Sequence, residues 1–200
     1  MPDINGIPYV ESGDLVSAYP TVSQDLAQEV SDQLATKLAA ADQKIIQVIS
    51  TTKTDAFTES VATGAVSGDV TGLTATITPT TNTNKVLVIC HLTGTAGGTN
   101  PILPALYRAG SLINAATGDA AGSRSRVTSV GREAAGTIAS TANFVYLDSP
   151  ASTSALTYSI RLRHGGGGTN TVYVNRSETD TDAATTARTI STITLMEVGA

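Results

Sequence analysis

Three alternating acids near the C-terminus form the clearest cluster of candidate metal ligands. Glu178, Asp180 and Asp182 are spaced two apart, so an extended backbone places their carboxylates on one side of the chain. Carboxylate oxygens are the ligands that Ca²⁺ prefers. We favour a solvated loop tip and expect no metal site, since the glycine-containing pattern of calcium loops is missing.

Two pairs of arginines also have the spacing of a strand face. Arg124 and Arg126 form one pair, and Arg161 and Arg163 form the other. The guanidinium group is a planar fork that binds anionic groups, so Arg161 and Arg163, with Tyr173, are candidate contacts for an anionic glycan. The interpretation that we favour is pairing between strands or subunits with acids such as Glu133 or Asp148, which adds little stability where the pair is exposed.

The remaining reactive side chains do not form a recognisable catalytic pattern. Cys90 and His91 are adjacent on an expected strand and therefore point to opposite faces, which favours Cys90 as a small buried hydrophobe. The run Gly165–Gly168 is followed by Thr and Asn, so it is expected to be a hairpin loop and not a phosphate-binding loop. No nucleophile-elbow motif occurs. We therefore expect a protein that is not an enzyme and that uses no cofactor.

The composition is typical of an all-β exterior protein. Charged residues make up 14% of the chain, Trp is absent, and Thr accounts for roughly a sixth of the residues. Residues 1–55 hold eight acids and three lysines, which accounts for the whole net charge of −5. The absence of a clustered basic surface argues against nucleic-acid binding. No apolar run approaches the 18 residues of a membrane span, and the first residues lack a signal-peptide pattern, so we expect synthesis in a cytoplasm.

The N-terminal residues divide into two segments with different patterns. Residues 1–21 contain three prolines and two glycines, which favour an extended arm. Its large side chains are expected to dock on a partner surface, or else to fold back on the chain: Ile4, Ile7, Tyr9, Val10, Leu15, Val16 and Tyr19. Residues 22–44 predict an amphipathic helix, N-capped by Ser23 and ending near Gln43, with a stripe at every fourth position: Val22, Leu26, Val30, Leu34 and Leu38. The stripe is expected to pack on the following domain or to bundle with its copies.

Residues 45–200 predict a domain of eight or nine short strands separated by turn-rich segments, which is typical of an antiparallel β-sandwich or jelly roll. In the expected strand 156–164, Tyr158, Ile160 and Leu162 face inward, and Ser159, Arg161 and Arg163 face outward. The last strand is almost apolar on both faces, which indicates a central strand or one at a subunit interface. The expected strands are 45–54, 73–78, 85–93, 102–107, 123–130, 137–147, 156–164, 171–175 and 187–198.

Several of these segments resemble parts of bacteriophage virion fibre and appendage proteins. Thr171–Asp182 and Ala187–Val198 resemble the terminal strands of a domain in tail-fibre and other virion proteins, and Ile4–Val16 with Tyr19–Leu26 are similar to N-termini of minor tail and fibre proteins. Five further segments resemble the start and middle of the same domain: Ile45–Asp55, Leu73–Thr80, Lys85–Val88, Gly122–Arg126 and Phe144–Pro150. The resemblance implies a virion appendage that is commonly trimeric, with its N-terminus on the particle and its C-terminal domain distal.

The sequence therefore predicts a structural component of a phage virion. We expect a short homotrimeric fibre or decoration protein on the exterior of the particle, whose arm binds capsid or tail proteins and whose head is a β-sandwich. The alternative is a tail-fibre tip module that binds a host surface polysaccharide.

Overall fold

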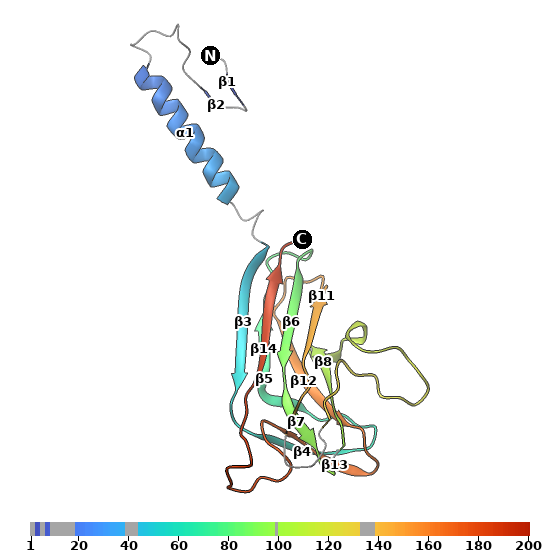
Figure 1. The fold of residues 1–200 in the computed structure, drawn as a ribbon. Helices are drawn as coiled ribbons and strands as arrows, with labels where there is room; N and C mark the ends of the chain where they lie inside the picture. Colours follow the sequence, from blue (N-terminus) through green and yellow to red (C-terminus); the bar gives the residue numbers. More distant parts are fainter. Residues whose placement is uncertain (1–2, 5–6, 9–18, 39–43, 99, 133–138) are drawn as a thin grey trace. The chain divides into compact units, whose positions relative to one another are not determined.

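The computed structural model describes residues 3–4, 7–8, 19–38, 44–98, 100–132 and 139–200 (Figure 1). The chain divides into two compact units, Met1–Lys44 with Gly199 and Ile45–Val198 with Ala200. The second unit, which we call the head, contains three four-stranded β-sheets.

The first unit contains a short hairpin and the helix. Strands β1 (Asp3–Ile4) and β2 (Ile7–Pro8) pair antiparallel, and α1 runs from Tyr19 to Leu38. The prediction of a start at Ser23 was wrong, and the expected end near Gln43 lies outside the described residues. Pro20 fits the first turn of the helix, because the backbone N–H that proline lacks has no helical partner there. Along the stripe, Val22 is buried, Leu26 is half-buried and Val30 is 49% exposed.

The strands of the head form three sheets in which every pair is antiparallel. One sheet has the order β11-β6-β14-β3, the second β5-β12-β8-β9 and the third β10-β7-β13-β4. Their bounds are β3 (Ile45–Lys53), β4 (Phe57–Ala62), β5 (Asp69–Ile77), β6 (Lys85–His91), β7 (Thr93–Ala96), β8 (Ile102–Arg108), β9 (Ser111–Leu112), β10 (Ser140–Thr141), β11 (Phe144–Asp148), β12 (Leu156–His164), β13 (Thr169–Val174) and β14 (Ser191–Val198), with a 3-10 helix at Asn114–Ala116.

The sheets pack on one another around a shared apolar core. Strand β5 contacts β3 and β14 without pairing with them, so the second sheet lies against the first. A single residue, Leu92, separates β6 from β7, so the third sheet continues from the first. The core includes Leu73 of β5, Val88 of β6, Leu106 of β8 and Leu195 of β14, all with 0% exposure. The prediction of a mainly β chain with antiparallel sheets is confirmed.

The alternation in β12 is confirmed for its inward face and corrected at one outward position. Tyr158, Ile160 and Leu162 are fully buried, as predicted. Ser159 was expected to face solvent but is also buried, because its hydroxyl donates to Asp69 Oδ1 at 2.8 Å across the β12–β5 pair.

Other strand predictions were wrong in particular places. Residues 123–130 form a loop, in which Arg126 donates to the backbone carbonyls of Gly118 and Asn114. The segment expected to be a turn after Thr93 contains β7, and β4 was not predicted. Strand β14 begins at Ser191, four residues later than expected, and lies in the centre of its sheet between β6 and β3 (Figure 1).

Candidate functional site

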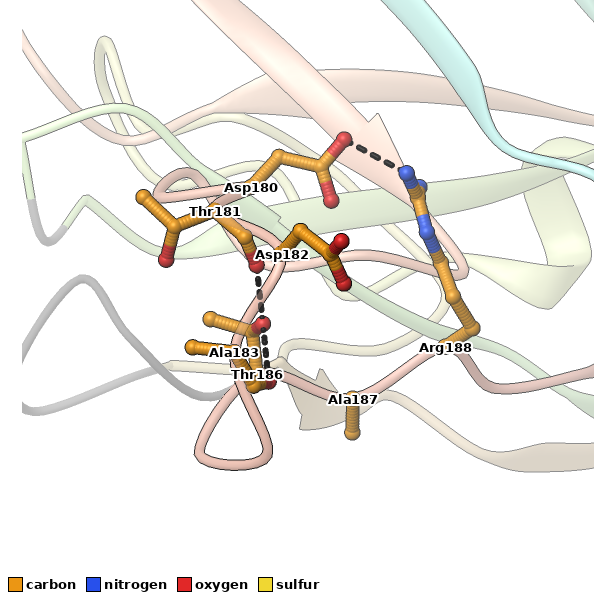
Figure 2. A pocket seen from close by; sticks show the side chains of 7 residues that line it. All are labelled: Asp180, Thr181, Asp182, Ala183, Thr186, Ala187 and Arg188. Atoms are coloured by element: carbon orange, nitrogen blue, oxygen red, sulfur yellow. Dashed lines mark hydrogen bonds and ion pairs between the residues drawn. The ribbon is translucent and has the colours of Figure 1, made fainter.

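The segment between β13 and β14 carries a pocket of about 310 Å³, lined by Asp180–Ala183 and Thr186–Arg188 (Figure 2). The volume is near the lower end of the range for small-molecule sites. The Thr186 hydroxyl donates to the carbonyls of Thr181 and Ala183, at 2.5 and 2.9 Å, which closes the turn at one side of the pocket.

Asn175 fixes the start of this segment. It adopts a positive φ of 61°, a conformation that Asn tolerates better than most residues. Its buried amide donates to the backbone carbonyls of Lys53 and Asp55, at 2.9 and 3.0 Å, and its Oδ1 accepts from Ser191 Oγ at 2.7 Å. The amide thus ties the two ends of the loop to the end of β3.

Asp180 is the centre of a charged cluster at the pocket. Its Oδ2 accepts from Arg188 Nη2 at 2.6 Å and lies 3.3 Å from Arg176 Nη1, and Figure 2 shows Asp180 and Arg188 pointing toward one another. The Arg176 guanidinium lies 4.9 Å from the centroid of the Tyr173 ring, a cation–π contact. The cluster therefore combines an aromatic face with two arginines that share one carboxylate.

The three alternating acids are not brought together. The segment that holds them is not a strand, so their side chains do not share one face. Glu178 Oε2 accepts from the Gly98 N–H at 2.8 Å, whereas Asp180 is paired with arginines. Among the residues that the structure describes, no group of three His, Cys, Asp or Glu side chains is arranged to hold a metal ion.

The candidate glycan contacts fall into two different clusters. Arg161 Nε donates to Asp69 Oδ1 at 2.7 Å, and its guanidinium lies 4.4 Å from the centroid of the Tyr107 ring. Arg163 Nη1 donates to the carbonyl of Gly64, whereas Tyr173 contacts Arg176. Burial would raise the pKa of Asp69, but the bonds from Arg161 and Ser159 outweigh it and lower that pKa.

The acid that pairs with Arg161 differs from both predicted ones. Asp148 accepts instead from Arg108 Nη1 at 2.5 Å and from the Tyr158 hydroxyl at 2.6 Å. Glu133 lies outside the described residues. Sequence alone could not identify Asp69, because the pair depends on the register irregularity that sets Arg161 opposite Asp69.

Cys90 and His91 face opposite sides of their strand, as predicted. Cys90 is buried, which raises the pKa of its thiol to about 12. His91 is half-buried, with Nε2 3.3 Å from Thr93 Oγ1. His164 is buried elsewhere, where its Nδ1 accepts from the Gly166 N–H and its Nε2 therefore carries the proton toward the carbonyl of Val61 at 2.8 Å.

The expected anchoring and helix residues are only partly described. Ile4 lies in β1, Ile7 in β2 and Tyr19 at the start of α1. Four of the expected anchoring residues lie outside the described part: Tyr9, Val10, Leu15 and Val16. Leu34 and Leu38 belong to α1, but their side chains also lie outside it.

Among the acids of the head that the structure describes, the most densely hydrogen-bonded one was missed by sequence reasoning. Glu197 has 0% exposure, and its carboxylate accepts from Gln47 Nε2 at 2.5 Å, the Thr80 N–H at 2.6 Å, the Thr80 hydroxyl at 2.7 Å and Asn84 Nδ2 at 2.6 Å. An acid on the same strand face as Ile193 and Leu195 was the available signal for this site.

No helix within the described residues combines the length and the apolar character needed to cross a membrane. A scan against protein-family models matched none, and a search of curated proteins found no relative. The class that the structure defines is therefore a mainly β protein with packed antiparallel sheets.

Proposed function

We propose that this chain is a structural component of a bacteriophage virion, a short homotrimeric fibre or decoration protein. The observation that carries the proposal is the apolar stripe of α1, which a single copy covers at Val22 but leaves 49% exposed at Val30. A stripe of this kind is covered when copies of the helix bundle together. The likeness of several segments to virion appendage proteins supplies the setting.

In this proposal the three parts of the chain have different roles. The arm, which is the part of the chain before α1, docks on capsid or tail proteins. The helix forms a short three-stranded bundle, and the heads are displayed on the exterior of the particle. The strand orders β11-β6-β14-β3 and β5-β12-β8-β9 support the finer interpretation of the head as a jelly roll.

The mass of the full chain in solution tests the assembly. Light scattering should give three times the chain mass of 20.4 kDa. Leu26→Asp should lower that mass, because it places a charge in the bundle core. Ala27→Asp is the matched control, since Ala27 is exposed on the same helix and off the stripe. A monomeric native chain, or a Leu26→Asp variant that remains a trimer, would contradict the bundle.

The location on a particle needs a separate experiment. An antibody raised against the head should decorate the outside of particles purified from lysates in which the chain is made. Gold labelling in electron microscopy would show the position, and particles without the chain would refute the virion assignment.

Binding of an anionic surface glycan is the second candidate function. Two features favour it: the Arg176 guanidinium lies over the Tyr173 ring beside the pocket, and the Arg188 side chain at the pocket is 57% exposed. Tyr173→Ala should weaken binding of the head to envelope polysaccharide of the host, measured by calorimetry. Arg161→Ala and Arg163→Ala test the second cluster in the same way. Equal affinity for the native chain and all three variants would contradict this function.

A further inference from the structure

The side of the β11-β6-β14-β3 sheet that faces away from the core carries an apolar row across all four strands. The ladder places Val48 opposite Met196, Met196 opposite Leu87, and Leu87 opposite Leu147. The neighbouring residues along each strand face the core, as the burial of Val86, Val88 and Leu195 shows. Val48 is 52% exposed and Leu147 is 44% exposed, so the ends of the row are open to solvent.

A second row lies beside the first and completes the patch. It consists of Ser50, Thr194, Ile89 and Val145, which also stand opposite one another in the ladder. Val145 is 65% exposed. The hydroxyls of Ser50 and Thr194 bond to each other at 2.9 Å, so their polar atoms already have a partner if the surface becomes buried. We call these two rows the outer face.

The outer face concentrates the exposed apolar side chains of the head. Of the seven large hydrophobic residues that are exposed in the described part of the chain, Val48, Val145 and Leu147 lie on it, and Ile45 lies in the adjoining row with Val198 and Lys85. Neither row contains a charged residue. The flanking rows add one cation, Lys85, and one histidine, His91.

We propose that the outer face is where copies of this chain contact one another. Three observations select a second copy as the occupant, and the number of copies rests on the proposed function. The first is charge: a charged partner finds no complementary group on these rows, whereas identical copies meet there without placing like charges together.

The second observation is area. Four strands about 4.8 Å apart and rows about 7 Å apart give a footprint of roughly 400 Å² when the flanking rows are included. A standard stable interface buries about 800 Å² on each partner. The outer face is therefore too small to hold an independent partner on its own, but it suffices for a partner that is also held by another contact. A copy of the chain, joined through its own α1, meets that condition.

The third observation is the connection within the chain. Strand β3, one edge of this sheet, starts at Ile45, and α1 ends at Leu38, so six residues separate them. When helices associate, so short a connection raises the effective concentration of one head near another, into the millimolar range. A face that associates weakly alone is then occupied in the assembly.

Thiol labelling of the full chain tests this interface. Val145→Cys places a thiol on the outer face, and Val130→Cys is the matched control, because Val130 is 59% exposed and lies outside the β11-β6-β14-β3 sheet. The native Cys90 is buried and should remain unlabelled while the fold is intact, which gives an internal check on folding. Labelling with a polyethylene-glycol maleimide is followed at a concentration where the chain is assembled and again after dilution.

We expect the Val145→Cys variant to be labelled at least tenfold more slowly than the Val130→Cys variant in the assembly, and at the same rate after dissociation by dilution. Protection in a trimer supports both this interface and the proposed function, and protection in a dimer supports the interface while refuting the trimer. Equal rates in an assembled chain overturn the interface and leave the trimer standing. A monomer at all concentrations overturns both.

A second variant covers the case in which Val145→Cys disturbs the sheet. Leu147→Lys should lower the mass of the full chain, or lower the concentration-dependent temperature at which it dissociates, because it places a charge in the apolar row. Val130→Lys should leave both quantities unchanged. If the two variants have the same mass and the same dissociation temperature, the outer face is not a contact between copies.

Discussion

Replacing Glu197 by Gln tests whether the buried carboxylate near the end of β14 stabilises the head as an anion. All of its partners are donors: the Gln47 amide on Oε2, and the Thr80 N–H, the Thr80 hydroxyl and the Asn84 amide on Oε1. Gln47 also donates to the carbonyl of Thr78 at 2.8 Å, so it loses that bond if it rotates to accept. A glutamine side chain in place of Glu197 therefore directs its NH₂ group at another donor.

The pKa of Glu197 sets the size of the effect. Burial alone would raise this pKa, but the hydrogen bonds from Gln47, Asn84 and Thr80 outweigh burial and lower it from 4.5 to about 2. Because the pKa is depressed in the folded state, the stabilisation is present above pH 4.5 and is lost as the pH falls toward 2. The difference corresponds to about 3 kcal/mol of unfolding free energy at neutral pH. We expect Glu197→Gln to cost that amount at pH 7.

Urea denaturation at pH 7, 5, 4 and 3 measures this dependence. The chain has six Tyr and no Trp, so tyrosine fluorescence and circular dichroism follow unfolding. The protein concentration stays fixed, since assembly makes stability depend on concentration. The difference between the native chain and Glu197→Gln should shrink by about 2 kcal/mol between pH 7 and pH 3. A difference that is the same at both pH values refutes the reasoning.

Glu59→Gln is the control, because the Glu59 carboxylate accepts from the Gly68 N–H near the surface. Its effect should be about 1 kcal/mol or less at pH 7. Other carboxylates that titrate over the same range act equally on the native chain and on both variants, so they cancel from the comparison.

Two further substitutions test the packing of the head. Tyr158→Phe removes the hydroxyl that donates to Asp148 at 2.6 Å and should lower the unfolding free energy by about 1–2 kcal/mol. Burial and this bond raise the pKa of Tyr158, so the stability of the native chain should fall as the pH rises above 10. Because the variant lacks this phenol, the rise in phenolate absorbance on unfolding above pH 10 should be smaller than in the native chain. Gly94→Ala should destabilise the head by about 1–3 kcal/mol in urea denaturation, because its Cβ would lie 2.3 Å from the Tyr173 carbonyl oxygen. Gly118→Ala is its control and should be nearly neutral, since nothing lies within 4 Å of that Cβ. Equal effects of the two alanines would contradict the close approach at Gly94.

The sequence predicted strands where alternation is strong and failed where small residues replace it. The bounds of β12 agree with the prediction because Tyr158, Ile160 and Leu162 alternate with polar residues. In contrast, β7 is the segment Thr-Gly-Thr-Ala, whose composition is typical of a turn. Gly94 is required there because β7 passes close to the backbone of β13. That constraint comes from a strand far away in the sequence, so no local pattern could reveal it.

The same reason limits what could be predicted of the candidate site. The sequence offered Arg161, Arg163 and Tyr173 as candidate contacts, but it could not assign Arg161 to Asp69 or Tyr173 to Arg176. The alternating acids suggested a common ligand set, whereas the fold uses Asp180 to neutralise two arginines. Which carboxylate meets which cation depends on strand register and loop path.

Strand β14 links stability and assembly through its two faces. Its inward face carries Ser191, Ile193, Leu195 and Glu197, each with 0% exposure, and its outward face contributes Thr194 and Met196 to the outer face. Because successive side chains point to opposite sides, a change on one face need not disturb the other. Glu197→Gln should therefore lower the unfolding free energy without changing the mass of the assembly. Leu147→Lys, on the neighbouring β11, should lower the mass of the assembly, whereas its unfolding free energy should equal that of the native chain once both are diluted to monomers. Measuring both quantities for both variants separates the two roles of this sheet.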